Sequence, residues 1–165
     1  ISIMSKITVT VSSKIEAPAA IVYNILADYN HHRNILPPKF FPGLDVVEGG
    51  VGAGTRFILH AKSFGGQTQM HMAVTEPAPG SVLVERDENT GLVTTFTVRP
   101  SSPTDANVTF ETVWQPLPGL KGVVDRMTTP LFMQIVYRQE MKILNEYARR
   151  QVQLRQAVVK RQNEK

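Results

Sequence analysis

The sequence has no cysteine, only one tryptophan, and no apolar run that approaches the roughly 20 residues of a membrane-spanning helix. The missing cysteines exclude a disulfide-stabilised scaffold and a metal site built on thiolates. Hydrophobic residues make up 42% of the 165 positions, which excludes an intrinsically disordered chain. A domain of this length buries roughly 70% of the surface of its unfolded chain. We therefore expect one globular domain with a substantial core.

The first residues also lack features of an export signal. Residues 1–6 have neither an apolar stretch nor a small-residue cleavage site, so we expect a cytoplasmic protein. Met4 is a candidate initiator, and residues 1–6 are expected to be an expression remnant or a disordered start. The domain is expected at 7–150, and a basic C-terminal helix end or tail at 151–165.

Positive charge is concentrated at one end of the chain. Residues 149–165 contain six basic residues and one acidic residue, a net +5, within a chain of formal charge +4. Residues 1–148 therefore sum to about −1. No aromatic side chain after Tyr147 alternates with these basic residues. The pattern favours a solvated helix end over a nucleic-acid or membrane contact, and we expect no nucleic-acid partner.

Hydrophobic periodicity predicts an α+β fold. A strand at residues 7–15 is followed by a helix at 19–27 and a second short helix at 31–36. Strands with turn residues between them are then predicted at 44–48, 55–62, 67–75, 81–86, 92–99 and 107–115. The regular spacing of these strands indicates an antiparallel meander.

A long helix is predicted from about Leu120 to near the end of the chain, with Pro130 marking either a kink or the true helix start. Its apolar positions lie at helical spacing, and Met133, Tyr137 and Met141 widen the stripe. A helix apolar on so many sides must be wrapped, which predicts a curved antiparallel sheet of about seven strands around it.

The opening of the chain resembles a known superfamily. A strand that ends in Ile15-Glu16-Ala17-Pro18, followed by Ile21-Val22-Tyr23-x-x-Leu26-x-Asp28, is similar to the start of the helix-grip, START-like (SRPBCC) proteins. The glycine pair in Gly52-x-Gly54-Thr55 resembles the one that precedes their third strand, although Ile35 stands near the place where many members have tryptophan. The resemblance covers Ile7 to about Arg150 and includes the bacterial polyketide cyclase/dehydrase-like branch. It implies the helix-grip fold and, more loosely, a hydrophobic ligand.

Several familiar sites are not indicated. The glycine-rich stretch 49–54 precedes a strand and not a helix, so it predicts a hairpin turn and not a dinucleotide-binding loop. His31 and His32 are adjacent, His60 and His71 lie on separate strands, and no metal-binding spacing exists, so we expect no metal and no cofactor. No Gly-x-Ser-x-Gly motif indicates a catalytic nucleophile.

Acid–base chemistry needs only one or two groups placed in a cavity, and it stays open. The candidates on strands are His60, His71, Glu85, Arg86, Arg99 and Glu111. Strand alternation points about half of these outward. The run Glu85-Arg86-Asp87-Glu88 is interpreted first as a solvated hairpin end.

The apolar strand faces suggest a binding site. Met70 and Met72 share one strand face, with Gln69, His71 and Thr75 opposite. Such faces form either a plain core or the lining of a cavity between sheet and helix, where flexible methionines suit a variable apolar guest. The candidate ligand-binding residues are Phe57, Leu59, His60, Met70, Met72, Arg86, Phe96, Trp114, Met127 and Phe132. Among them, His60 and Arg86 are expected to orient the ligand.

Three functions follow in order of preference. The first is binding of a hydrophobic small molecule, such as a lipid, an isoprenoid or an aromatic polyketide. The second is a polyketide cyclase or dehydratase that uses a histidine or carboxylate in the cavity. The third is a protein- or RNA-interaction module that acts through the basic end. The chain is expected to be a monomer or a homodimer without a membrane span.

Overall fold

A seven-stranded antiparallel sheet and one long helix make up most of the structure. The computed structural model describes residues 5–63, 66–116 and 119–165, without the side chains of Ser63 and of residues 120–128. In chain order the elements are β1 (Ile7–Ile15), α1 (Ala19–Ala27), the 3-10 turn η1 (His32–Asn34), β2 (Gly43–Glu48), β3 (Arg56–Ser63), β4 (Gly66–Ala78), β5 (Val82–Asp87), β6 (Val93–Pro100), β7 (Ala106–Trp114) and α2 (Leu120–Asn163).

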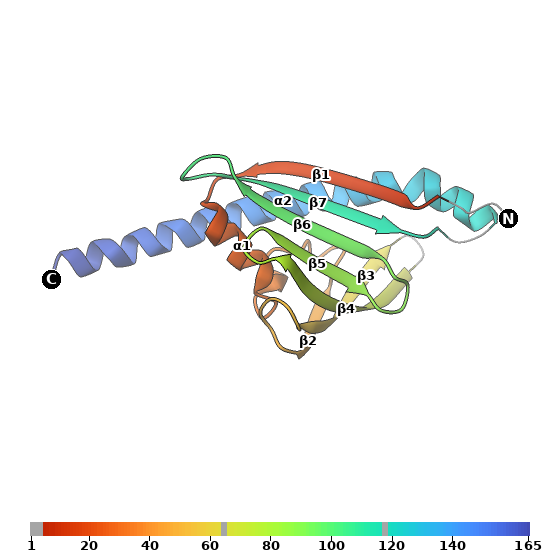
Figure 1. Ribbon diagram of the computed structural model, residues 1–165, viewed down its shortest axis with the longest axis horizontal. Helices are drawn as coiled ribbons and strands as arrows, with labels where there is room; N and C mark the ends of the chain where they lie inside the picture. The colour runs from red at the N-terminus through yellow and green to blue at the C-terminus, as the bar shows by residue number, and fades with distance from the viewer. Residues whose placement is uncertain (1–4, 64–65, 117–118) are drawn as a thin grey trace.

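The sheet is a meander closed by its first strand. Neighbouring strands pair in the order β1-β7-β6-β5-β4-β3-β2, so β1 lies beside β7 while β2 to β7 follow one another. The long helix α2 runs along one face of the curved sheet, and α1 leaves the end of β1 to contact β6, β7 and α2 (Figure 1). The C-terminal turns of α2 extend past the edge of the sheet.

The predicted α+β helix-grip architecture is therefore confirmed, with two differences in detail. The second short helix is only the 3-10 turn His32–Asn34, because Pro37 and Pro38 cannot extend a helix that begins so close to them. The long helix begins at Leu120 and continues through Pro130. Pro130 lacks the N–H that would bond the carbonyl four residues earlier, and the helix continues past that one missing bond.

The core lies between the inner face of the sheet and α2. Leu83, Phe96 and Phe110 are neighbours on β5, β6 and β7, and all three are buried. The rings of Phe96 and Phe110 meet edge to face with centroids 4.8 Å apart. From α2, Leu144 and Ala148 are fully buried one turn apart, which follows from the four-residue spacing of the predicted stripe.

The packing of α2 gives a first testable expectation. Leu144→Ala should lower the free energy of unfolding by about 2–5 kcal/mol, because the substitution leaves a cavity beneath a fully buried side chain. Urea denaturation followed by circular dichroism measures this change. Leu154→Ala is the matched control, since Leu154 lies on the same helix and is 61% exposed. Equal effects of the two changes would contradict the packing described here.

Candidate functional site

A row of polar side chains crosses the middle of the inner sheet face. The strand register places Glu85 opposite Thr94, and Thr94 opposite Thr112, on β5, β6 and β7. Val74 on β4 and Val9 on β1 continue the row on either side. All five residues are buried, because strand alternation directs each toward α2. The hydroxyls of Thr94 and Thr112 lie 2.8 Å apart, which leaves the Glu85 carboxyl to find partners elsewhere.

Tyr29 supplies one of those partners. Its hydroxyl donates a hydrogen bond of 2.8 Å to Oε1 of Glu85. The chain leaves α1 just before Tyr29, and the Tyr29 N–H bonds the carbonyl of Gly50 at 2.8 Å, which fixes the backbone there. The Tyr29 ring stacks between His32 and Phe57, with centroid separations of 4.9 and 4.8 Å. The phenol is therefore held toward Glu85 by packing on both of its faces.

The long helix contributes a second carboxyl and a second phenol. Glu140 is only 3% exposed, and it lies one turn after Val136 and one turn before Leu144 on the sheet-facing side of α2. Tyr137, which is also buried, hydrogen-bonds Thr112 through its hydroxyl and meets the ring of Phe110 edge to face. Among the residues that the structure describes, none hydrogen-bonds the Glu140 carboxyl.

Glu85, Glu140, Tyr29 and Tyr137, with Thr94 and Thr112, form what we call the interior polar cluster. Burial raises the pKa of Glu85 to about 7, and the hydrogen bond from Tyr29 opposes this shift. Burial raises the pKa of Glu140 well above its ordinary value, and the negative charge of Glu85 raises it further. These shifts favour the protonated form of Glu140, while Glu85 is divided between its acid and carboxylate forms near pH 7.

No cation compensates these carboxyls within the described part of the chain. The buried polar side chains there are His32, Thr55, Asp87 and members of the cluster, and no Lys or Arg is among them. The described ion pairs, such as that between Arg56 and Glu88, lie on the surface. Among these residues no group of three or more metal-ligating side chains is found either. The interior therefore offers protonated carboxyl and hydroxyl groups surrounded by apolar side chains.

His32 lies behind Tyr29 and is neutral. Burial lowers its pKa to about 4, although the Leu26 carbonyl and Asp28 oppose that shift. Its Nδ1 lies 3.1 Å from the carbonyl oxygen of Leu26, which places the ring proton on Nδ1. The adjacent His31 is exposed and contacts Asp28 at 2.7 Å, so the two histidines point apart as their sequence positions predict.

The structure separates the predicted ligand-binding residues into three groups. The first lies between sheet and helix; it comprises the inner-face residues Phe57, Leu59, Met72, Phe96 and Trp114, which are buried, and Met70 on the same face and Phe132 on α2, which are partly buried against the core. The second, His60 and Arg86, lies on the outer face of the sheet. The third is Met127, whose side chain lies outside the described residues. Ligand contact at the inner-face positions stays a prediction.

The outward position of His60 and Arg86 follows from strand alternation. His60 Nε2 lies 2.8 Å from Asp45 Oδ2 on the neighbouring strand, and the Arg86 side chain is exposed. Both residues are one position away from inward-facing neighbours, Leu59 and Glu85. Neither is placed to orient a ligand beneath the sheet.

The interpretation of residues 85–88 as a solvated hairpin end is wrong for Glu85 and Asp87. Both face inward and are buried, because Leu83, Glu85 and Asp87 alternate with exposed or half-buried residues. Asp87 accepts hydrogen bonds from the turn that follows, including one of 2.6 Å from the Thr90 hydroxyl. Glu85 has no such local role. The alternation itself was the signal that could have separated Glu85 from its solvated neighbours.

Glu140 was missed by the sequence analysis. The signal was present, since Glu140 interrupts the apolar stripe between Val136 and Leu144 at the four-residue spacing. A charged residue inside such a stripe predicts either a helix face that turns outward or a buried ionisable group. The structure shows the buried group.

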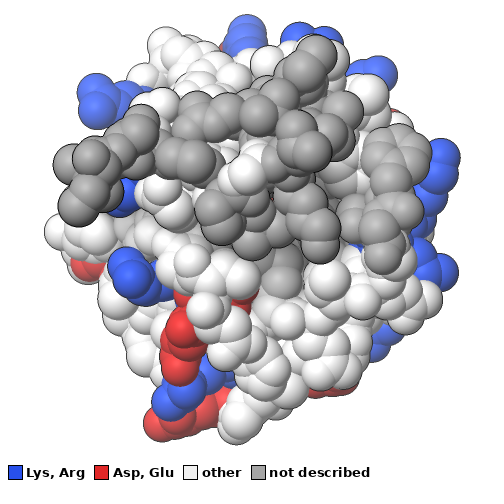
Figure 2. Space-filling view, turned by 90° about the vertical axis from the view of Figure 1, so that its right-hand side faces the viewer, with Lys and Arg blue, Asp and Glu red and all other residues white. Residues whose placement is uncertain are grey.

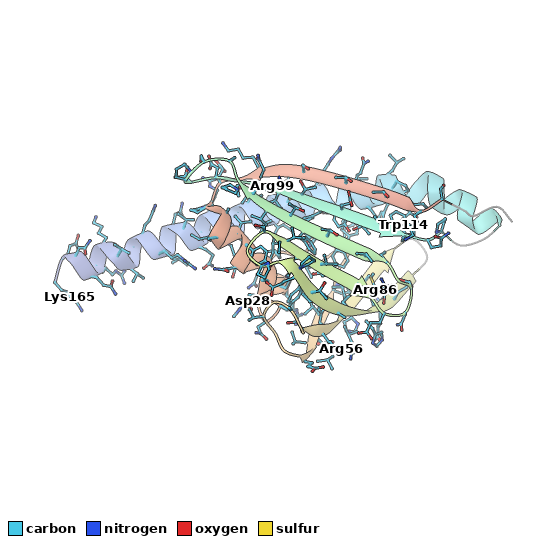
Figure 3. All side chains as sticks on the ribbon, in the orientation of Figure 1. Asp28, Arg56, Arg86, Arg99, Trp114 and Lys165 are labelled. Atoms are coloured by element: carbon cyan, nitrogen blue, oxygen red, sulfur yellow. The ribbon has the colours of Figure 1, made fainter. Side chains whose placement is uncertain are left out.

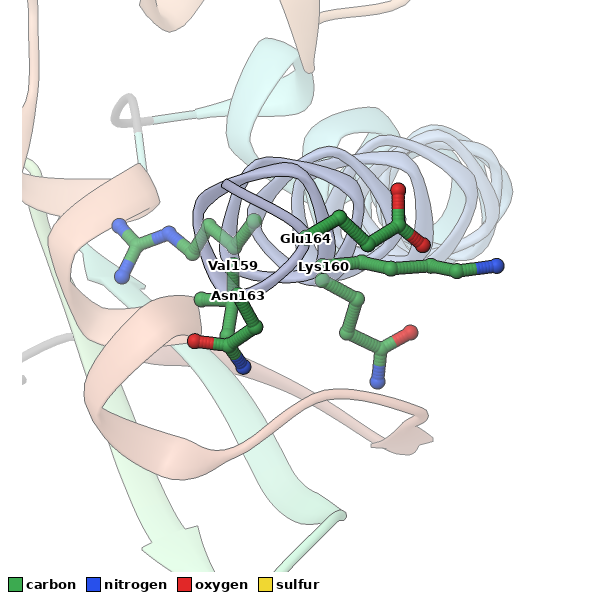
Figure 4. Close-up of a pocket in the computed structure, with 6 residues that line it drawn as sticks. Val159, Lys160, Asn163 and Glu164 are labelled. Carbon is green, nitrogen blue, oxygen red and sulfur yellow. The ribbon is translucent and has the colours of Figure 1, made fainter.

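A surface hollow also lies along the last turns of α2 (Figure 4). It is lined by Arg155, Gln156, Val159, Lys160, Asn163 and Glu164. These residues belong to one helix and its C-terminal cap, and no second element encloses the hollow among the lining residues. It is open surface between side chains and lies far along α2 from the interior polar cluster.

A comparison with known protein families identifies the family to which this fold belongs. The family described as "Polyketide cyclase / dehydrase and lipid transport" matches residues 6–149. The chain belongs to this family. No curated protein matches the sequence. Within the described residues, no helix is long and apolar enough to cross a membrane.

Solved structures share the family fold. The KanY protein, known from an NMR solution structure, is 26% identical, with a TM-score of 0.76 over 88% of this chain and 99% of that one. The Zhui aromatase/cyclase from Streptomyces sp. R1128 is 17% identical, with a TM-score of 0.77 over 90% and 96%. The protein TTHA0849 from Thermus thermophilus is 19% identical, with a TM-score of 0.70 over 86% and 97%. The last two show a common fold.

The buried carboxyl gives a pH-dependent prediction. The pKa of an unperturbed glutamate, as in the unfolded chain, is 4.5, and the pKa of Glu85 in the folded protein is about 7. Between these two pH values the folded protein therefore binds the Glu85 proton more tightly than the unfolded chain does. The stability from this proton is complete below about pH 4.5 and is lost as the pH rises to about 7. Relative to the wild type, Glu85→Gln should therefore gain up to about 3 kcal/mol of unfolding free energy between about pH 4.5 and 8.

Urea denaturation across this pH range measures the difference between variant and wild type. The matched control is Glu111→Gln on the exposed face of β7. The raised pKa of Glu85 would be contradicted if Glu111→Gln increased the unfolding free energy by the same amount. It would also be contradicted if the stability gained by Glu85→Gln became smaller as the pH rises.

Proposed function

We propose that the protein binds a hydrophobic small molecule between the inner face of the sheet and α2, with the interior polar cluster fixing the orientation of one polar group of that ligand. The observation that carries the proposal is Glu140, a 3% exposed residue inside an apolar helix stripe, whose carboxyl has no hydrogen bond to another described residue although no side-chain oxygen among these residues is both fully buried and without a partner. A largely buried carboxyl that no cation of the described residues compensates is destabilising. A polar group that a ligand brings to it would lower that cost.

The side chains around the cluster suit an apolar guest. Met72 and Phe57 pair across β3 and β4, and Phe96 pairs with Leu83 on β5. Met70 and Phe132 are only partly buried at the margin of this lining. Binding would be driven by removal of apolar ligand surface from water, at roughly 25 cal/mol per Å². Methionine side chains adapt their shape at low cost, which favours a ligand with rings or a flexible chain.

The protonation state of the cluster indicates which polar group the ligand presents. Protonated Glu140 donates a hydrogen bond, and so does the acid form of Glu85. Both groups suit a carbonyl or hydroxyl oxygen. A lipid, an isoprenoid or an aromatic polyketide with an uncharged oxygen fits this description better than a sugar or a nucleotide, which would bury many more polar groups without partners.

Native mass spectrometry and dye binding test this proposal. Protein purified without detergent is compared under native and denaturing conditions, and any mass that leaves on denaturation is identified in the organic extract. The neutral fluorescent dye Nile red then serves as a defined probe of the apolar site. Met72→Lys should lower dye affinity at least about tenfold, because it places a charge in the lining.

The control for this change is Arg86→Gln, on the outer face of the sheet beside the same strands. Circular dichroism establishes that each variant is folded. If Met72→Lys does not fold, Met72→Gln provides the same comparison with a neutral side chain. Equal dye binding by the wild type, the Met72 variant and the Arg86 variant would refute the proposed site.

The raised pKa of Glu85 supports a second candidate, proton transfer on a bound carbonyl compound. The Glu85 carboxylate would accept a proton from the carbon next to a ketone, while the Glu140 acid donates a hydrogen bond to the enolate oxygen. Return of the proton from Glu85 to the carbon completes the exchange. This chemistry matches the cyclase/dehydrase part of the family description.

Deuterium exchange distinguishes this activity from binding alone. With 1-acetonaphthone in D₂O, the protein should accelerate deuterium incorporation into the methyl group, and the rate should rise with pH to a plateau with its midpoint near 7, where Glu85 ionises. Glu85→Gln should abolish the acceleration while leaving Nile red affinity within about threefold of the wild type. Acceleration that survives Glu85→Gln would exclude Glu85 as the base.

A further inference from the structure

The helix α2 continues well beyond the domain that it packs against. Residues 153–165 are all exposed, and the helix itself extends to Asn163. Its last turns project past the sheet, with side chains directed outward around the axis and Lys165 at the tip (Figure 3). The family match ends at residue 149. We call residues 150–165 the α2 extension, and the family fold does not account for it.

Three aliphatic side chains of the α2 extension are strongly exposed; Leu154 and Val158 share one side of the helix, whereas Val159, which is 55% exposed, lies toward the other side. Leu154 and Val158 are one helical turn apart and are 61% and 54% exposed. Gln153, Gln156 and Asn163 lie toward the opposite side of the helix. A solvated spacer helix gains nothing from two aliphatic residues in register, so this face points to a partner with an apolar component.

Basic residues border the same face. Helical geometry places Arg161 on one side of the line through Leu154 and Val158 and Arg155 on the other side, with Lys165 two turns beyond Val158. The segment 149–165 carries a net +5, whereas residues 1–148 carry about −1. On the face of the domain shown in Figure 2, Lys and Arg are scattered and form no single patch. The partner must therefore combine negative charge with an apolar layer.

We propose that the α2 extension binds the surface of membranes that contain anionic lipids, with Leu154 and Val158 inserted at the headgroup level. Long arginine side chains reach phosphates while their methylene groups lie against the apolar layer. Clustered basic residues on an exposed helix are attracted to anionic leaflets, and exposed aliphatic residues add burial to that attraction. A second copy of the extension is disfavoured as the partner because two helices of net +4 repel each other.

Nucleic acid is a poorer match for the same surface. Binding to single strands uses aromatic side chains on which bases stack, and none follows Tyr147 in the sequence. Phosphate contacts alone would leave Leu154 and Val158 in water. The membrane proposal goes beyond the proposed ligand binding and does not depend on it, although a membrane is also where a hydrophobic ligand dissolves.

Vesicle sedimentation with the full chain tests the proposal. Vesicles of phosphatidylcholine are compared with vesicles that contain about 30% phosphatidylglycerol, and the bound-to-free ratio should be at least about tenfold higher with the anionic lipid. Raising the salt to about 0.5 M should remove most of this preference. Leu154→Gln combined with Val158→Gln should lower binding to anionic vesicles at least about threefold.

Matched control variants distinguish an effect of the Leu154 and Val158 face from an effect of changing any exposed residue or any charge. Gln153→Ala with Gln156→Ala changes two residues of the same turns away from the face and should leave binding unchanged. Arg155→Gln with Arg161→Gln should abolish the lipid preference, whereas Lys62→Gln with Arg99→Gln removes the same charge from the exposed surface of the domain and should not. All these side chains are exposed, so the variants should fold, as circular dichroism can establish.

Three results would overturn the proposal. These are equal binding to both kinds of vesicle, no binding to either, and anionic binding that is insensitive to the Leu154 and Val158 changes. A gel shift with a single-stranded oligonucleotide, or a concentration-dependent dimer, that depends on these residues without vesicle binding would assign the face to a different partner. Nile red binding by the Leu154 and Val158 variant reports separately on the interior site, so failure of one proposal leaves the other measurable.

Discussion

The inner face of the sheet must be covered, and the structure depends on α2 to cover it. Seven strands in a curved meander gain most of their stability from burying that face, and Leu83, Phe96 and Phe110 have no access to solvent or very little. Where α2 crosses β7, Tyr137 contacts Phe110 and hydrogen-bonds Thr112. These contacts fix the rotation of the helix about its axis. They therefore also decide that Glu140, three residues later, faces inward.

Glu140 and Glu85 are costly residues to place in such an interior. Burial favours their neutral forms, and the negative charge of Glu85 raises the cost of ionising Glu140. An apolar residue at either position would give a more stable core, as replacements of buried ionisable groups in proteins often do. Tyr29 partly compensates Glu85, but it is itself held in place by stacking on His32 and Phe57. Two ionisable residues, Glu85 and Glu140, thus stand close together where a core normally has apolar side chains. Such departures from normal core composition are typical of functional sites.

The sequence predicted the fold more completely than the site. Strand alternation and helical spacing are local properties, so the order of elements and inner-face residues such as Met72 and Phe96 could be read directly. Glu85 was assigned to solvent because its charged neighbours suggested a hairpin end, and alternation was given too little weight. The pairing of Glu85 with Glu140 could not be predicted, since it depends on how α2 is rotated over β5. His60 and Arg86 were expected to orient a ligand because of their residue type, but both lie on the outer face of the sheet, away from the interior polar cluster.

The same helix obeys different constraints along its length. From Val136 to Ala148 apolar side chains at helical spacing are buried against the sheet, whereas Leu131 and Ile135, four residues apart near the start of the helix, are exposed. Beyond Val152 no residue of the helix belongs to the core, yet Leu154 and Val158 lie exposed four residues apart, on a different side of the helix from Leu144 and Ala148. A helix of this length without packing is only marginally stable in water, so an exposed extension needs a reason to keep both helical spacing and aliphatic residues. Since the positive charge of the chain is also gathered there, a binding surface explains all three features, whereas a solvated helix end explains only the charge.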